Sequence, residues 1–191
     1  MAQASELPKS TLRMASDGRD TAPGRVSLAE APPDTPGQLR GALRRMAKAV
    51  VVVTCRLAER RFAMAATAVS ELSMAPPSLL VCVNKSASIW EPLSRVEHFG
   101  ISILHRAQRS IAENCSGAMK GEARFGMGSW GESPDGVPYL LDAQAYIFCR
   151  NERRVDYGTH GIFIGQVLAA HTTGEVSPLV YLDGQYTGAS G

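Results

Sequence analysis

The chain has 191 residues, of which 45% are hydrophobic and 20% charged, and its formal net charge is +2. This length suits one domain, or one domain with a tail, and is long enough to bury a core. The mild positive charge comes without a stripe of basic residues interleaved with aromatics, so nucleic-acid binding is not indicated. The longest apolar runs have the length of strands, so no membrane-spanning helix is expected.

The first 36 residues differ in composition from the rest of the chain. They are rich in Pro, Gly, Ser, Asp and Ala and contain few large apolar residues. Such a segment cannot bury enough surface to offset the entropy of ordering. We therefore expect a disordered arm over residues 1–36 and a single domain over residues 37–191. The start of the chain also has no continuous apolar stretch of the kind that secretory signals contain.

The four cysteines are widely scattered and include no C-x-x-C pair. They are Cys55, Cys82, Cys115 and Cys149. This pattern predicts neither a disulfide framework nor a zinc ribbon. Three of them lie inside apolar, strand-like runs, where a reduced cysteine behaves as a small hydrophobic residue. We expect the protein to reside in the reducing cytoplasm.

After the arm, the pattern begins with a helix and then becomes mostly β. Leu39, Leu43 and Met46 recur at i, i+4 and i+7 and predict an amphipathic helix over residues 38–48. A nearly continuous β-branched run then predicts a buried strand over residues 49–57.

The rest of the chain alternates between apolar runs and turn signals. A hairpin is expected within residues 62–73, and the Gly-rich stretch 117–138 is longer than an ordinary connection, which indicates a functional or mobile loop. Further strands are predicted over residues 78–84, 98–104, 139–151, 160–172 and 178–188. Short helices are predicted over residues 87–96 and 107–117.

This order of elements predicts a mainly β protein. Six or seven strands with two or three short helices favour an antiparallel barrel over a sandwich. Helices do not alternate regularly with strands, so a doubly wound α/β fold fits poorly. No internal repeat is visible.

The familiar catalytic motifs are absent from the sequence. There is no G-x-G-x-x-G after a strand, no G-x-x-x-x-G-K-[ST], no H-E-x-x-H and no G-x-S-x-G. His98, His105, His160 and His171 have no partner at metal-ligand spacing. Hydrolase and metalloenzyme functions are therefore disfavoured, and no metal site is predicted.

Three less familiar stretches are candidates for ligand contact. "NKSAS" (84–88) follows a buried strand with a dense set of donors, which suits an anion or an ordinary serine helix cap. "AMAATAVS" (63–70) is rich in small residues, which suits a flat ring or close packing under a helix. In "DYGTHGIFIG" (156–165) a histidine lies between glycines and is either a solvated turn residue or a ligand contact.

Taken together and in order, these stretches resemble the flavin reductase family. "MAATAVSELSMAPPSLLVCVNKSASIWEPL", then "HFGISIL", then "DYGTHGIFIG" have the order and spacing of these short NAD(P)H:flavin oxidoreductases, and the resemblance covers residues 39 to about 187. It implies an antiparallel split β-barrel that binds FMN or FAD and uses NADH or NADPH as co-substrate. It also implies a homodimer that supplies reduced flavin to a partner monooxygenase.

The resemblance also implies which residues contact the cofactors. Beside the isoalloxazine ring it puts Ala65, Ala66, Thr67 and Ala68, with Ser102 near the flavin. Near the ribityl chain and phosphate it puts Asn84, Lys85, Ser86, Ala87 and Ser88, and at the rim Arg124 and Phe125. Gly158, Thr159 and His160 correspond to the Gly-Asp-His signature that is associated with the nicotinamide.

Two positions depart from the family pattern. Thr159 replaces the usual Asp and so removes a negative charge beside His160, and Ala65 stands where many members have Thr. Hydride transfer itself needs no acid or base, because the cofactors carry the chemistry. We expect His160 to orient the nicotinamide, and backbone N–H groups or Lys85 to stabilise charge on the reduced flavin. A split-barrel protein that retains its flavin as a sensor, carrier or reductase of another substrate, and a barrel whose site has decayed, stay open as alternatives.

Overall fold

The structure is a computed structural model that describes residues 34–188, and it is mainly β. Its strands are β1 (Lys48–Ala49), β2 (Val51–Leu57), β3 (Arg60–Ala66), β4 (Val69–Met74), β5 (Pro77–Asn84), β6 (His98–Ile103), β7 (Trp130–Glu132), β8 (Pro138–Leu140), β9 (Ala145–Tyr157), β10 (His160–Thr172), β11 (Leu179–Leu182) and β12 (Gln185–Gly188). Its α-helices are α1 (Thr35–Leu43), α2 (Trp90–Leu93) and α3 (Arg109–Glu113), and its other helical turns are η1 (Arg106–Gln108), η2 (Asn114–Ala118) and η3 (Gly121–Phe125). None of the helices in this range is long and apolar enough to cross a membrane.

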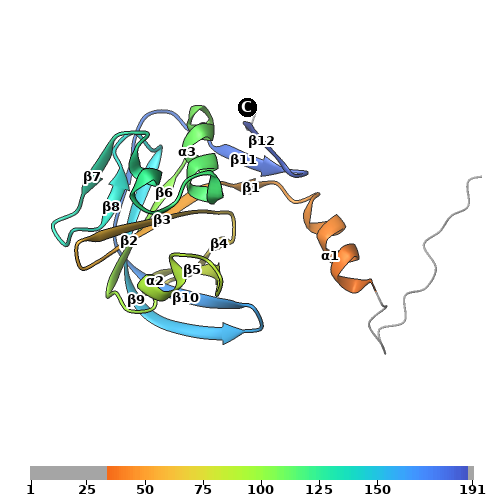
Figure 1. Ribbon diagram of the computed structural model, residues 1–191, viewed down its shortest axis with the longest axis horizontal. Coiled ribbons are helices and arrows are strands. Elements are labelled where there is room, and N and C mark those ends of the chain that lie inside the picture. Colours follow the sequence, from red (N-terminus) through yellow and green to blue (C-terminus); the bar gives the residue numbers. More distant parts are fainter. Residues whose placement is uncertain (1–33, 189–191) are drawn as a thin grey trace, which may run out of the picture.

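One seven-stranded antiparallel sheet makes up most of the fold. Its strand order is β3-β2-β6-β9-β10-β5-β4, so β3 and β4 form its two edges. These edge strands are consecutive in the chain and only Thr67 and Ala68 lie between them. A sheet whose first and last strands are joined by two residues must curl back on itself. The described strands therefore form a barrel that is split between β3 and β4, as expected for the fold class (Figure 1).

Two smaller sheets extend this barrel. β1, β11 and β12 form one, and β7 and β8 form the other. Backbone hydrogen bonds tie the first to the barrel, because Val50 N–H donates to Leu179 O at 2.9 Å and Leu104 N–H donates to Val50 O at 3.0 Å. The C-terminal strands are thereby held beside β2 and β6.

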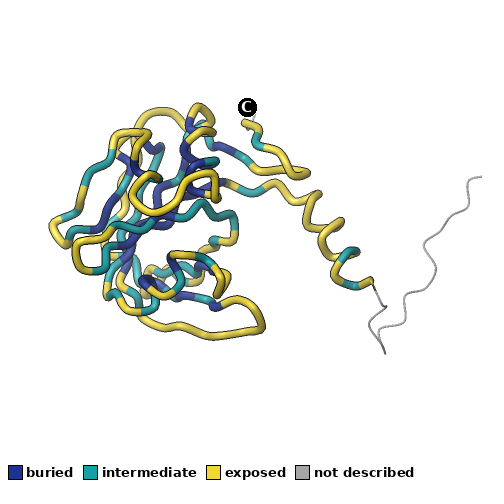
Figure 2. Tube along the Cα trace, in the orientation of Figure 1, coloured by how far each residue is buried: buried dark blue, intermediate teal, exposed yellow. Residues whose placement is uncertain are grey.

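The residues of β2 contribute to two separate hydrophobic clusters. Val52 packs in one cluster with Leu104 and Leu140, whereas Val51 and Val53 pack in the other. Alternate residues of a strand point to opposite faces of its sheet, so a strand that is covered on both faces needs a continuous apolar run. That requirement explains the unbroken β-branched stretch, and Figure 2 shows the buried chain at the centre of the molecule.

The four cysteines are free thiols, and three of them are buried in these clusters. Burial raises the pKa of the Cys55 and Cys149 thiols to about 12 and that of the Cys115 thiol to about 11. Desolvation penalises the charged thiolate, so these side chains are neutral apolar packing groups.

Several predicted elements need correction. Residues 62–73 do not form a hairpin, because β3 pairs with β2 and β4 pairs with β5 at the opposite edge. The strand expected over residues 139–151 is two strands, β8 and β9, which belong to different sheets. The last predicted strand is the hairpin β11–β12, whose turn residues Asp183 and Gly184 have φ of +49° and +81°. Positive φ at both positions is the Asp-Gly signature of a type I′ turn.

Helix α1 lies outside the barrel (Figure 1). None of its residues is buried, and the predicted apolar face is open, with 56% of Leu39 and 43% of Leu43 exposed. Arg44, the residue that follows the helix, forms an ion pair with the C-terminal hairpin, because its Nε lies 2.9 Å from Asp183 Oδ1. The arm predicted before the helix falls almost entirely outside the described residues.

Candidate functional site

The short link between the two edges of the barrel lies at the meeting point of three hollows. We call Thr67 and Ala68 the seam. Thr67 lines all three hollows, which have volumes of about 540, 630 and 290 Å³. Ala65 and Ala66 line the first of these and Ala68 the second. Because these side chains end at Cβ, they leave open space where larger residues would fill the split.

The first hollow combines aromatic and charged walls. Tyr181 and Tyr186 face each other edge-on, with ring centroids 5.2 Å apart. Arg109 lies over the Tyr186 ring at 5.9 Å and pairs with Glu113 at 2.8 Å. The positive charge of Arg109 is balanced by the negative charge of Glu113, so this wall is polar and does not favour an anion.

The second hollow has an apolar floor. It is formed by side chains from β2, β5, β6 and β9, which include Val51, Leu79, Ile101, Ile103 and Ile147. Its rim contains the seam residues together with the segment that leads from α1 into β1. Such a surface can hold an apolar ring or an apolar side chain from another molecule.

The turn after β5 is shaped by its own hydrogen bonds. The Asn84 side-chain carbonyl accepts from the backbone N–H and from the hydroxyl of Ser86, each at 2.9 Å. The Ala87 backbone N–H donates to Asn84 O at 2.9 Å, and Ser88 Oγ accepts from Arg124 Nη1 at 3.1 Å. These contacts leave the turn exposed yet ordered, so its hydroxyl and backbone donors are held in place.

The β9–β10 turn brings the predicted histidine next to this first turn. His160 opens β10 and is the cross-strand partner of Asn84 on β5. Thr159 Oγ1 lies 2.9 Å from His160 Nδ1, so a hydroxyl occupies the place where the family pattern has a carboxylate. The two motifs are far apart in the sequence, and the pairing of β10 with β5 makes them neighbours.

Lys85 connects the two turns. Its backbone N–H donates to Thr159 O at 2.9 Å and its Nζ donates to Gly158 O at 3.0 Å. Its Nζ also lies 3.8 Å from Asp156 Oδ2, and Arg154 Nε contacts the other oxygen of Asp156 at 3.0 Å. The ammonium that is expected at a phosphate or at the reduced flavin is part of a bridge between the two turns in this structure.

Backbone conformation and packing explain the two glycines of this turn. Gly158 has φ of +52° with open space around it, so it is there for the turn. A Cβ on Gly161 would lie 2.4 Å from the indole of Trp90. Because Trp90 begins α2, Gly161 permits the packing of the hairpin against that helix.

Arg124 and Phe125 lie in η3, within the long Gly-rich stretch. Arg124 Nη1 donates to the Ala63 carbonyl as well as to Ser88, and Arg124 Nε donates to Met119 O at 3.0 Å. Phe125 is buried and packs edge-on against Trp130 with ring centroids 4.7 Å apart. Arg124 therefore joins β3 to the turn after β5, and Phe125 packs in the hydrophobic core.

Ser102 lies in the interior of the fold. It is fully buried in β6, and its Oγ accepts a hydrogen bond from the Leu140 backbone N–H at 3.1 Å. Its face of β6 is covered by β8, so the hydroxyl satisfies a buried donor between the two strands. The expectation that Ser102 lies near the flavin stays a prediction, and the structure gives its hydroxyl this structural role.

The site as a whole is suited to binding and orientation. No group of three or more His, Cys, Asp or Glu residues within residues 34–188 has the geometry to hold a metal ion. Asp156 and the ion pairs around η3 were missed by sequence reasoning, because scattered exposed charges give no periodic signal. The arrangement offers open space at the seam, ordered donors at one turn and a held imidazole at the other.

A model of one protein family matches nearly the whole described chain. It is the family described as "Flavin reductase like domain", and it matches residues 43–190. The chain is 39% identical over 161 residues to the reductase component of FADH(2)-dependent resorcinol hydroxylase from Rhizobium sp. (strain MTP-10005), which covers 83% of this chain and 90% of that protein. It is 31% identical over 157 residues to the FMN reductase (NADH) RutF of Variovorax paradoxus (strain S110), which covers 82% of this chain and 87% of that protein.

Solved structures agree with this fold. BorF, the flavin reductase component of a bacterial two-component tryptophan halogenase, superposes with a TM-score of 0.74 at 31% identity over 80% of this chain and 97% of that one. The NADH:FAD oxidoreductase SgcE6 of Streptomyces globisporus C-1027, in complex with NAD and FAD fragments, superposes with a TM-score of 0.75 at 25% identity over 83% of this chain and 94% of that one.

Proposed function

This chain belongs to the flavin reductase family, and we propose that it catalyses the NAD(P)H-dependent reduction of FMN or FAD and supplies the reduced flavin to a partner monooxygenase. The observation that carries the proposal is the connection of three predicted segments. The pairing of β5 with β10 puts the Asn84–Ser88 turn beside the Gly158–His160 turn, and Arg124 connects Ser88 to Ala63 on β3, the strand that leads into the seam.

The residues present fit a flat ring that carries a phosphate. Ala65 and Ala66 line open space, so a planar group has room at the seam. The Ser88 hydroxyl and the Arg124 guanidinium lie together at the turn after β5, and a guanidinium has five N–H donors. We propose that Ala65, Ala66, Thr67 and Ala68 contact the ring, and that Asn84, Ser86, Ala87, Ser88 and Arg124 bind the phosphate side.

The proposed reaction asks the protein for orientation and not for proton transfer. When both are bound, the nicotinamide supplies a hydride and the flavin accepts it. We propose that His160, which contacts Thr159 in the turn fixed by the Lys85 bridge, hydrogen-bonds the nicotinamide carboxamide.

A shallow, open site also suits a flavin that leaves after reduction. We propose that the chain acts as a homodimer, because the exposed apolar face of α1 and the apolar floor of the second hollow both call for a partner surface. A single species of twice the chain mass in light scattering is the expected result. The four free thiols support a reducing cytoplasmic location.

One assay separates the proposal from its alternatives. NADH consumption is followed at 340 nm with and without added FMN or FAD, after the visible spectrum of the purified protein is recorded. We expect turnover that depends on added flavin. A yellow protein without NADH oxidation would indicate a flavin-binding protein that retains its cofactor, and a colourless protein indifferent to flavin would indicate a decayed site.

A further inference from the structure

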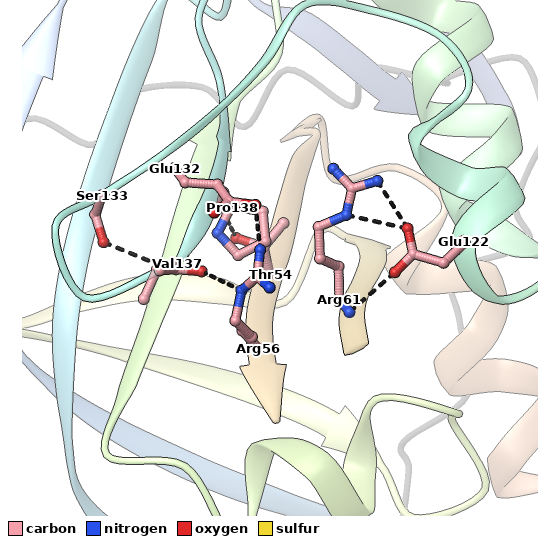
Figure 3. A network of polar contacts seen from close by, with 9 residues as sticks. Thr54, Arg56, Arg61, Glu122, Glu132, Ser133, Val137 and Pro138 are labelled. Atoms are coloured by element: carbon pink, nitrogen blue, oxygen red, sulfur yellow. Dashed lines mark hydrogen bonds and ion pairs between the residues drawn. The ribbon is translucent and has the colours of Figure 1, made fainter. Parts of the chain in front are cut away.

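Two arginines face each other across the hairpin of β2 and β3. Arg56 on β2 and Arg61 on β3 are cross-strand partners. Like charges directly opposite each other destabilise a strand pair, so each arginine needs its own counter-charge. Both counter-charges come from the long stretch after η2, as Glu122 pairs with Arg61 and Glu132 pairs with Arg56 (Figure 3).

The pair of Arg61 and Glu122 is geometrically complete. Arg61 Nη2 and Nε donate to Glu122 Oε2 at 2.7 and 3.0 Å, and the Arg61 backbone N–H donates to Oε1 at 3.0 Å. The Arg61 guanidinium also lies over the Phe125 ring at 4.3 Å. Arg61 thus contacts η3 at both ends, because Glu122 lies near the start of η3 and Phe125 is its last residue.

Arg124 lies between the two residues of η3 that Arg61 contacts. Its guanidinium reaches the Ala63 carbonyl on β3 and the Ser88 hydroxyl in the turn after β5. The position of η3 therefore decides where this guanidinium lies relative to that turn. A change of even a fraction of an ångström there alters the placement of donors around a bound anion.

The second pair anchors a part of the same stretch that does not reach the turns. Arg56 pairs with Glu132 on β7, and its Nε donates to Gly136 O at 2.9 Å. Thr54, two residues earlier on β2, donates to the Pro138 carbonyl. Figure 3 shows the two pairs side by side with their partners on opposite sides of the hairpin.

We propose that the ion pair of Arg61 and Glu122 is a positioning device for flavin binding, which holds Arg124 against Ser88. This inference rests on the proposed function, since it concerns the same site. Arg61 and Glu122 act through Arg124 and not by touching the flavin. The pair of Arg56 and Glu132 is also an arginine–glutamate ion pair on the hairpin of β2 and β3. It anchors β7 and does not position Arg124.

The two pairs provide matched variants. Glu122→Ala is compared with Glu132→Ala, and flavin binding is measured for the full chain by quenching of FMN and FAD fluorescence, with kcat and thermal unfolding measured alongside. We expect Glu122→Ala to raise the flavin Kd about tenfold. At saturating flavin its kcat should stay within about twofold of the parent, because the hydride step is not altered. Glu132→Ala should leave the Kd unchanged, and both variants should lower Tm by similar small amounts.

A conservative variant and a double variant make the test specific. Glu122→Gln keeps an acceptor oxygen for Arg61, so it should recover most of the lost affinity, and Arg61→Gln combined with Glu122→Ala should weaken binding no more than either change alone. Equal Kd values for both Glu→Ala variants would overturn the inference, and so would additive losses in the double variant. If the parent protein binds and reduces flavin while Glu122→Ala matches it, only the positioning role fails. A parent that neither binds nor reduces flavin refutes the proposed function itself.

Discussion

The seam and the two turns beside it are built on opposite principles. At the seam, small side chains leave three hollows that meet at Thr67. At the turns, Asn84, Lys85 and Thr159 are engaged in hydrogen bonds that fix their backbone and side chains. The seam leaves room for a ligand, and the turns hold hydrogen-bonding groups in fixed orientations. A site that must admit a flat molecule, orient it and release it needs both kinds of region.

The same sheet produces this contrast. Its two edges, β3 and β4, meet without pairing at the seam, whereas β5 and β10 pair in register through His160 and Asn84. Open space therefore lies where the barrel is split, and rigid turns lie where neighbouring strands end together. Substitutions in the two regions should have different kinetic effects.

The largest effect is expected from filling the space at the seam. Thr67→Trp puts a large ring where the three hollows meet, so a planar ligand would have to displace it. We expect kcat/KM for flavin to fall about 100-fold or more, with little change in Tm because Thr67 lies in a bend between strands. Thr67→Ser is the control and should retain activity. Full activity of the tryptophan variant would show that the seam is not the flavin site.

A smaller effect, confined to one substrate, is expected at the histidine turn. His160→Ala removes the imidazole that Thr159 and the strand pairing hold in place. We expect the KM for NADH to rise about tenfold, because the loss of one orienting contact costs on the order of 1.4 kcal/mol. The Kd for flavin should stay nearly constant in fluorescence titration. Wild-type kinetics in this variant would remove His160 from the site.

A still smaller effect is expected from Lys85, which bridges the two turns. Lys85→Met removes the contacts of Nζ to Gly158 and Asp156 but keeps the backbone bond to Thr159. If the lysine acts by positioning, the KM for NADH rises by about threefold and the flavin Kd changes less. If it binds the phosphate, as the family pattern implies, the flavin Kd rises more than the NADH KM. Steady-state kinetics with each substrate varied in turn decides between these roles.

The smallest effect concerns stability in acid. Hydrogen bonds from Arg61 lower the pKa of Glu122 below its ordinary value, and the charge of Arg56 acts in the same direction. A carboxyl with a lowered folded-state pKa stabilises the fold above its unfolded pKa of about 4.3, and that contribution is lost as pH falls below it. The side chain is half exposed, so the loss should be small. The difference in urea midpoint between the parent and Glu122→Gln should therefore shrink between pH 7 and pH 3.5.

The sequence predicted the strands better than their connections. Residues 160–172 match β10 because the apolar alternation is long and bounded by turn residues. The break between β8 and β9 was missed because Leu141 and Ala143 continue the apolar run through the turn. The hairpin of β11 and β12 had a readable Asp-Gly signal at residues 183–184, and the sequence analysis overlooked it.

The candidate site was predictable only in part. Order and spacing of motifs indicated two turns that the pairing of β5 with β10 makes neighbours, and the roles of their residues stay predictions. The burial of Ser102 beneath β8 was not predicted, because a strand pattern does not say which face another sheet covers. Asp156, Arg61 and Glu122 were missed because ion pairs between distant, exposed residues depend on tertiary structure and leave no trace in spacing.

The three buried thiols have a chemical consequence. Reduced flavin that is released into aerated solution reacts with dioxygen and yields hydrogen peroxide, so a protein with this function works beside an oxidant. Oxidation of cysteine proceeds through the thiolate and requires access. Cys55, Cys115 and Cys149 are buried, and their pKa values of about 12, 11 and 12 keep them protonated at neutral pH. The core is thereby protected from a by-product of the protein's own turnover.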